Sequence, residues 1–156
     1  MNIIINATQH NATPEQLEAG VCASTHETKL REWLTFDSIP SRLTIQQHAQ
    51  FIAGYVVDQA MEIVKNADFD APHHKALQQL AGMPAYRDTI CKSFRIKAMI
   101  GGAPYLMSEL EKELWHLGIE PVYAFTKRES VESVDENGNV TKTAVFKHAG
   151  FVSAIQ

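Results

Sequence analysis

The chain has 156 residues, of which 45% are hydrophobic and 21% are charged, and its formal net charge is −4. This size and balance predict a single domain, residues 1–156, that can bury its own core. The acidic balance argues against the broad basic surface with which proteins follow long nucleic acids. A small anionic ligand held at one local site remains compatible with it.

Neither the cysteines nor the N-terminus indicates secretion. Cys22 and Cys91 are far apart and lack CxxC spacing, so neither a disulfide framework nor a zinc ribbon is expected. The opening MNIIINAT has no basic region and too short an apolar run for a signal peptide, and no later segment approaches the roughly 18 apolar residues of a membrane span. We therefore expect a cytoplasmic protein that does not enter a membrane.

The first expected element is a strand over residues 2–8, because the three consecutive isoleucines at 3–5 are typical of a strand buried on both faces. A helix follows it in the prediction. Thr13 is the expected N-cap, Pro14 occupies the first helical position, and Gln16 completes a capping box.

A second strand and a long helix are expected next. Residues 33–36, Trp-Leu-Thr-Phe, form the candidate strand, which ends before a proline. From Leu43 to about Val64 apolar residues recur at steps of three and four, so we expect a helix capped by Ser41 or Thr44. Its apolar face is wide enough that a second copy of the chain could cover part of it.

Residues 66–97 mix helix breakers with short helical patterns, and we expect two short helices that decorate the main sheet as an insert. A third strand is predicted at 98–100. It runs into two glycines and a helix with a leucine stripe, which Gly118 closes at its C-terminal end.

The fourth strand is predicted over residues 121–126, and a separate hairpin is expected from strands 130–134 and 140–146, joined by the Asn137-Gly138 turn. Strand, helix and strand at this spacing predict a βαβ unit. The fold class expected is therefore α/β, a Rossmann-like, mostly parallel sheet flanked by helices, with a C-terminal β-hairpin that extends the sheet.

Three of the expected strands end in residues suited to an anionic ligand. In an open α/β sheet the carboxyl ends of the strands meet at one edge, where ligands bind. Backbone donors at a glycine turn, an imidazole, hydroxyls and cations together suit phosphate groups. The three ends are Thr8-Gln9-His10, Gly101-Gly102-Ala103 and Thr126-Lys127-Arg128.

Each of these segments also has a structural interpretation. The glycines can make a tight turn, His10 can be a hydrogen-bonded structural histidine, and Lys127-Arg128 can be a solvated strand end. The adjacent His73-His74 pair lacks the spacing of metal ligands, so we expect neither a metal site nor a cofactor.

Several motifs resemble the small, single-domain CRISPR-associated proteins of the CARF-like, Rossmann-like group that includes ring nucleases. The similar segments are HNATPEQ and FDSIP in the first 40 residues, and GGAPYLM, EPVYAFTKRESVE and VFKHAGFV between Gly101 and about Phe151. They cover a little over half of the chain. Residues 66–97 lie outside the similarity.

The resemblance implies that the chain binds a cyclic oligoadenylate, a second messenger of antiviral defence, as a homodimer. If the chain is similar to the ring-nuclease members of the group, it also cleaves this ligand without a metal ion. On this hypothesis His10 transfers a proton, and Lys127 and Arg128 stabilise the charge on the phosphoryl oxygens. The remaining residues expected to contact the ligand are Thr8, Gln9, Gly101, Gly102, Ala103, Tyr105, Thr126, Lys147 and His148.

Two other functions remain open. A binding module would capture or sequester a nucleotide or phosphate ligand at the same edge without chemistry. An interaction protein of a mobile element would instead assemble through the long helix and the hairpin.

Overall fold

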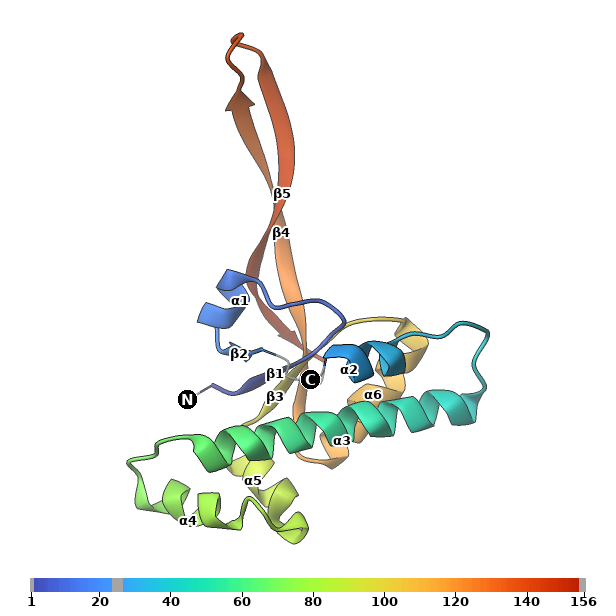
Figure 1. The fold of residues 1–156 in the computed structure, drawn as a ribbon, viewed down its shortest axis with the longest axis vertical. Helices are drawn as coiled ribbons and strands as arrows, with labels where there is room; N and C mark the ends of the chain where they lie inside the picture. The colour runs from blue at the N-terminus through green and yellow to red at the C-terminus, as the bar shows by residue number, and fades with distance from the viewer. Residues whose placement is uncertain (1, 24–26, 155–156) are drawn as a thin grey trace.

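The computed structural model describes residues 2–23 and 27–154. It is an α/β fold with a five-stranded mixed sheet in the order β2-β1-β3-β4-β5 (Figure 1). The strands β2, β1, β3 and β4 are parallel neighbours, and β4 and β5 are antiparallel. The sheet is therefore mixed rather than purely parallel, and the predicted C-terminal hairpin is confirmed. The strands are β1 (Ile4–Ala7), β2 (Val21–Cys22), β3 (Lys97–Ile100), β4 (Glu120–Val134) and β5 (Val140–Ser153).

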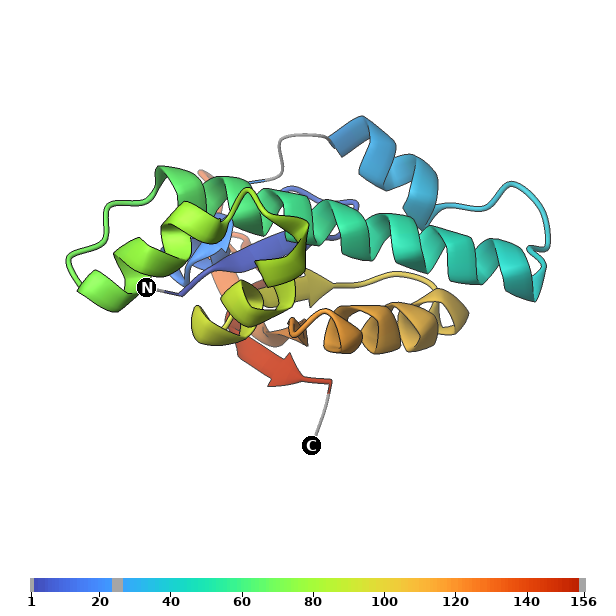
Figure 2. The ribbon, with the colours of Figure 1, turned by 90° about the horizontal axis from the view of Figure 1, so that it is seen from below.

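Most of the helices share one large core with the sheet. The helices are α1 (Pro14–Glu18), α2 (Glu27–Leu34), α3 (Arg42–Asn66), α4 (Pro72–Leu80), α5 (Arg87–Ser93) and α6 (Pro104–His116), with a 3₁₀ turn η1 (Pro84–Tyr86). Figure 2 shows α3 and α6 side by side against the sheet. Because side chains alternate along a strand, Ile3 and Ile5 join this large core, whereas Ile4 faces a smaller cluster with Val21, Met99 and Val122.

Several local predictions are confirmed. Thr13 and Gln16 form the capping box of α1: the Thr13 N–H donates to Gln16 Oε1 at 3.0 Å, and the Gln16 N–H donates to Thr13 Oγ1 at 3.3 Å. Ser41 caps α3 by accepting from the Thr44 N–H at 3.1 Å. Gly118 follows α6 at φ +73, a conformation that glycine adopts without strain.

The strand predicted at residues 33–36 is wrong. Trp33 and Leu34 end helix α2, in which Leu30 and Leu34, one turn apart, are both buried in the core. The second strand is instead the two-residue β2, which follows a turn at Gly20. A strand of two residues shows no periodicity in the sequence, so it is recognised only by its hydrogen-bonded pairing with β1.

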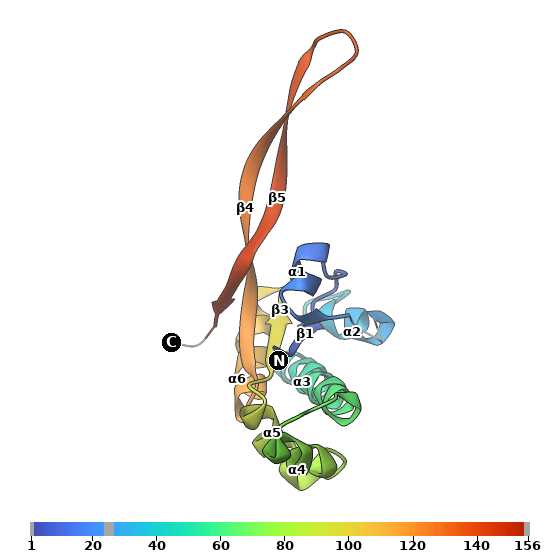
Figure 3. The ribbon, with the colours of Figure 1, turned by 90° about the vertical axis from the view of Figure 1, so that its left-hand side faces the viewer.

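Residues 66–97 do contain two short helices, but they belong to the core. Leu77 of α4, Ile90 and Cys91 of α5, and Phe94 are buried in the same cluster as the sheet. The Gln78 Nε2 donates to the carbonyl oxygens of residues 64, 65 and 67 at 2.7–2.9 Å, which ties α4 to the end of α3. These helices complete the domain at the end opposite the hairpin (Figure 3).

The strand β4 continues far beyond the predicted stop at Thr126. It runs unbroken through Lys127-Arg128-Glu129 to Val134, and with β5 it forms a two-stranded ribbon that projects from the sheet (Figures 1 and 3). Every residue from Ala124 to Lys147 is exposed. A β-bulge between Phe125 and Thr126 marks the base of this ribbon.

No helix within the described residues has the length and apolar character needed to cross a bilayer.

Candidate functional site

A cleft of about 430 Å³ lies at the carboxyl ends of β1 and β3. From β1 the chain crosses to β2 on one side, and from β3 it crosses through α6 to β4 on the other side. The cleft therefore sits where the strand connections diverge, which is the usual ligand position in open α/β sheets. Its lining residues are Thr8, Gln9, His10, Asn11, Thr13, Gln16, Met99, Ile100, Gly101, Gly102, Tyr123 and Ala124.

The loop after β1 is held by Asn6, whose side chain is buried. Its Nδ2 donates to the His10 carbonyl oxygen at 2.8 Å, and its Oδ1 accepts from the Thr8 backbone N–H at 3.0 Å and from Thr8 Oγ1 at 2.8 Å. The His10 N–H donates in turn to Thr8 Oγ1 at 3.3 Å. One buried amide thus orders the segment that carries Thr8, Gln9 and His10 before any ligand arrives.

The glycine turn after β3 forms the facing wall of the cleft. A Cβ on Gly101 would lie 3.6 Å from Thr8 Cγ2, so the turn packs closely against the β1 loop. Gly102 has φ +155, which side chains rarely adopt. Ala103 is the N-cap of α6 and offers no side-chain hydrogen bond, so the helix begins beside the cleft without a side-chain cap.

The structure brings together five of the predicted site residues, Thr8, Gln9, His10, Gly101 and Gly102, which all line the cleft. Ala103 follows at the start of α6. Tyr105 is exposed and lines a neighbouring hollow with Phe36, whose ring centroid lies 5.8 Å from its own.

Lys127 and Arg128 do not line the cleft. The expectation that they terminate a strand is wrong, because β4 continues past them. In the ribbon register Lys127 lies opposite Lys147, and Arg128 lies opposite Phe146. Lys147 forms an ion pair with Glu129 at 3.1 Å. These cations stand along the lower part of the ribbon, beyond the cleft wall formed by Tyr123 and Ala124.

His148 lies at the bulge, opposite Thr126. Its ring contacts Phe151 with centroids 4.7 Å apart, and both ring nitrogens are buried without a hydrogen-bond partner within the described residues. The pKa of Glu15 in α1 is lowered chiefly by its own backbone N–H and by the Thr13 hydroxyl, with smaller contributions from His148 and Lys147. The base of the ribbon therefore lies within electrostatic reach of α1.

Several residues of this region were not predicted as site residues, among them Asn6, Asn11 and Tyr123. Asn6 had a signal in the sequence, since a polar residue inside an apolar strand needs a specific partner. Asn11 lines the cleft only because of the loop path. Tyr123 donates its hydroxyl to Glu111 Oε1 at 2.6 Å, and burial together with this carboxylate raises the pKa of Tyr123.

The described residues contain no group of three His, Cys, Asp or Glu side chains arranged to hold a metal ion. The rings of His73 and His74 are 5.8 Å apart, and His74 packs against Phe69 and Phe94. These contacts give His74 a packing role.

Comparison with known proteins gives one relationship. Neither the curated proteins nor the solved structures contain a match. Residues 72–152, just over half of the chain, match the Uncharacterized protein MJ1673 family. The matched segment runs from α4 to β5, so it includes the two short helices, the glycine turn and the whole ribbon, and it excludes the His10 loop. The chain belongs to the MJ1673 family.

Proposed function

We propose that this protein binds a cyclic oligoadenylate at the carboxyl edge of its sheet, as a homodimer, and cleaves it without a metal ion, as ring nucleases do. The fold on this proposal is a Rossmann-like relative of the CARF group. The observation that carries the proposal is the cleft at the divergence of the strand connections, where an ordered histidine loop faces a glycine turn and a helix start.

The cleft offers groups of the kind that a phosphodiester needs. Its glycine turn lets a phosphate approach the backbone closely, and the beginning of α6 favours negative charge. Thr8 and Gln9 add hydrogen-bonding groups, and no carboxylate lines the cleft within the described residues. This set suits an anion better than a cation.

The reaction proposed is a transesterification within the ring. The ribose 2′-oxygen attacks the adjacent phosphorus, the bond from phosphorus to the 5′-oxygen breaks, and the product is a linear chain with a 2′,3′-cyclic phosphate. His10 accepts the proton of the 2′-hydroxyl, and the leaving 5′-oxygen is protonated from solvent. Lys127 and Arg128 stabilise the charge on the phosphoryl oxygens as the ring extends from the cleft toward the ribbon.

A second copy of the chain is part of this proposal. A cleft of about 430 Å³ has the size of a site for one small molecule, whereas a ring of several nucleotides is larger. The ribbon exposes large apolar side chains, including Phe146 at 68% and Val134 at 67%. Between residues 127 and 148 it carries four Lys or Arg and four Asp or Glu residues, a balance that suits a protein partner better than a nucleic acid.

The test is incubation of the purified protein with cyclic oligoadenylates of different ring sizes, followed by chromatography of the products. We expect one ring size to give a linear product. His10→Ala should lower turnover by about 10²–10⁴-fold while ligand binding persists. Arg128→Ala should lower turnover as well. Lys142→Ala is the matched control, because Lys142 is a ribbon cation paired with Glu132 at 3.1 Å, nearer the ribbon tip.

Unchanged turnover in both His10→Ala and Arg128→Ala would show that these roles are assigned wrongly. Failure of every ring to bind would overturn the proposed ligand. Binding followed by recovery of intact ligand would support the second candidate, a binding module. That candidate is favoured by one observation, the position of Lys127 and Arg128 outside the cleft lining.

A further inference from the structure

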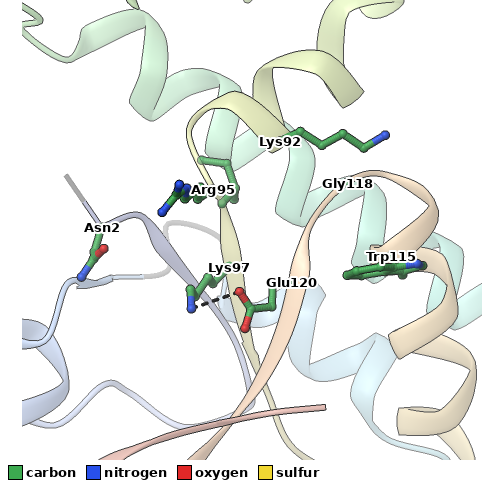
Figure 4. A pocket seen from close by; sticks show the side chains of 8 residues that line it. Asn2, Lys92, Arg95, Lys97, Trp115, Gly118 and Glu120 are labelled. Carbon is green, nitrogen blue, oxygen red and sulfur yellow. Dashed lines mark ion pairs between the residues drawn. The ribbon is translucent and has the colours of Figure 1, made fainter. Parts of the chain in front are cut away.

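A second hollow, of about 590 Å³, lies at the opposite edge of the sheet, where β3 and β4 begin. It is bounded by the end of α5, the last turn of α6 and Asn2, which precedes β1 (Figure 4). The side chains that give it chemical character are Lys92, Arg95, Lys97, Trp115 and Glu120. Neither the family relationship nor the proposed function assigns a role to it.

The charge of this hollow is predominantly positive. Lys97 pairs with Glu120 at 3.0 Å, and Lys92 pairs with Asp88 at 2.9 Å. Arg95 has no such partner: its guanidinium makes neither an ion pair nor a hydrogen bond with any described residue. In Figure 4 Arg95 and Lys97 lie on one side of the hollow. The Arg95 guanidinium is available to an incoming anion, and the Lys97 ammonium keeps N–H donors beyond the one directed at Glu120.

The backbone of Arg95 is unusual as well. It is the one non-glycine residue with a positive φ, +50, among the described residues. It occupies the position after the C-cap of α5, where the Ile96 N–H donates to the Cys91 carbonyl oxygen at 2.9 Å and the Arg95 N–H donates to that of Lys92 at 3.1 Å. Glycine is the residue favoured in such a Schellman motif, because any side chain is strained there.

The opposite wall of the hollow carries Trp115, a residue with 56% of its surface exposed. Gly118 lies so close to α5 that a Cβ at that position would be 2.7 Å from Asp88 Oδ1 and 2.8 Å from Lys92 Cγ. The α6–β4 turn therefore packs closely against α5, next to the last turn of α6, which carries Trp115. An exposed aromatic face across the hollow from an unpaired guanidinium suits a planar ring that carries an anionic group at its far end.

We propose that this hollow is a second ligand site, which binds a nucleoside monophosphate or a similar phosphorylated aromatic molecule. The phosphate lies on Arg95 and Lys97, and the ring stacks on Trp115. This proposal explains why a strained arginine occupies a position that favours glycine: glycine has no side chain with which to bind the phosphate. This site is at the other edge of the sheet from the carboxyl-edge cleft and does not depend on the function proposed for it.

The test uses the quenching of Trp115 fluorescence by adenosine 5′-monophosphate. Trp33 packs against Phe51 and Tyr55, so Trp33→Phe provides a background with one tryptophan. We expect saturable quenching, with adenosine alone and inorganic phosphate alone each binding at least tenfold more weakly. Arg95→Gly should weaken binding of the monophosphate at least tenfold. The melting temperature of this variant should be unchanged or higher than that of the parent, because glycine adopts the positive φ without strain.

Two controls separate this site from other effects. Lys112→Ala removes an α6 cation that pairs with Glu109 and lies outside the hollow, and it should leave the affinity unchanged. His10→Ala should also leave it unchanged, since His10 belongs to the carboxyl-edge cleft. Absence of quenching at millimolar adenosine 5′-monophosphate, equal affinity of Arg95→Gly and its parent, or loss of affinity in His10→Ala would each overturn the proposal.

Discussion

Replacing Asn6 with alanine should destabilise the protein and loosen the loop that carries His10. The substitution removes three side-chain hydrogen bonds, one to the His10 carbonyl oxygen and two from Thr8, at 2.8–3.0 Å. A hydrogen bond contributes about 1 kcal/mol net, and water can reach some of the released groups because His10 is exposed. We therefore expect a loss of about 1.5–3 kcal/mol, or roughly 3–12 °C in melting temperature for a domain of this size.

Urea unfolding followed by circular dichroism measures this loss. Asn66→Ala is the matched control, because the Asn66 amide also donates two hydrogen bonds, to the Glu62 carbonyl oxygen at 2.9 Å and to Glu62 Oε1 at 2.8 Å, but in an exposed position. The control should lose less than about 0.5 kcal/mol. Amide exchange at Thr8 should accelerate only in Asn6→Ala. Equal stability of the two variants would refute the argument that Asn6 orders the loop.

Three further outcomes follow from the geometry. Gly118→Ala should lower the free energy of unfolding in urea by about 1–3 kcal/mol, because the added Cβ would lie 2.7 Å from the Asp88 side chain of α5. The control Gly138→Ala, at the similar φ of +78, should lower it less, because no atom lies within 4 Å of the added Cβ. A larger loss in Gly138→Ala than in Gly118→Ala would contradict this argument. Burial, and to a smaller extent the nearby Asp88 carboxylate, raise the pKa of the Cys91 thiol to about 12. Iodoacetamide at pH 8 should therefore modify Cys91 only as the protein unfolds. Rapid labelling of Cys91 in the native protein would disprove this prediction. The backbone N–H of Glu15 and the Thr13 hydroxyl lower the pKa of Glu15 below 4.5. The ionised carboxylate therefore stabilises the folded protein at any pH above the ordinary pKa, and this stabilisation is lost as the pH falls through the lowered pKa. NMR titration should show this midpoint below 4.5 and its rise in Thr13→Val, and a midpoint at or above 4.5 would count against the assignment.

Local rules in the sequence predicted most of the helices. The Thr13 capping box, the Ser41 cap and the Gly118 terminus all appear as expected, because each depends on contacts within a few residues. The same holds for the third strand, whose apolar residues and following glycines are contiguous. Two sides of the carboxyl-edge cleft could therefore be predicted from the rule that parallel strands end at one edge.

The misassigned segments depend on partners distant in the chain. Residues 33–36 have β-branched and aromatic composition, yet Leu30 and Leu34 bury themselves in the core only as one face of a helix. The short strand β2 exists through its pairing with β1. Helices α4 and α5 were predicted to be peripheral, because the helix-breaking residues around them interrupt the apolar pattern of the sequence. Their buried faces are recognised only from their packing against α3.

Sequence alone determined the α/β class, the position of the glycine turn and the approach of His10 to it, because local turns, caps and strand direction fix these features. Tertiary structure decided where the cations lie. Lys127 and Arg128 read as a strand end, but pairing with β5 extends β4 through them and carries them onto the ribbon. Tertiary packing also set Arg95 opposite Trp115, two residues that are 20 positions apart in sequence and share no pattern. Hydrogen bonds and contacts between distant segments made both arrangements, and such contacts leave no periodic signal in one chain.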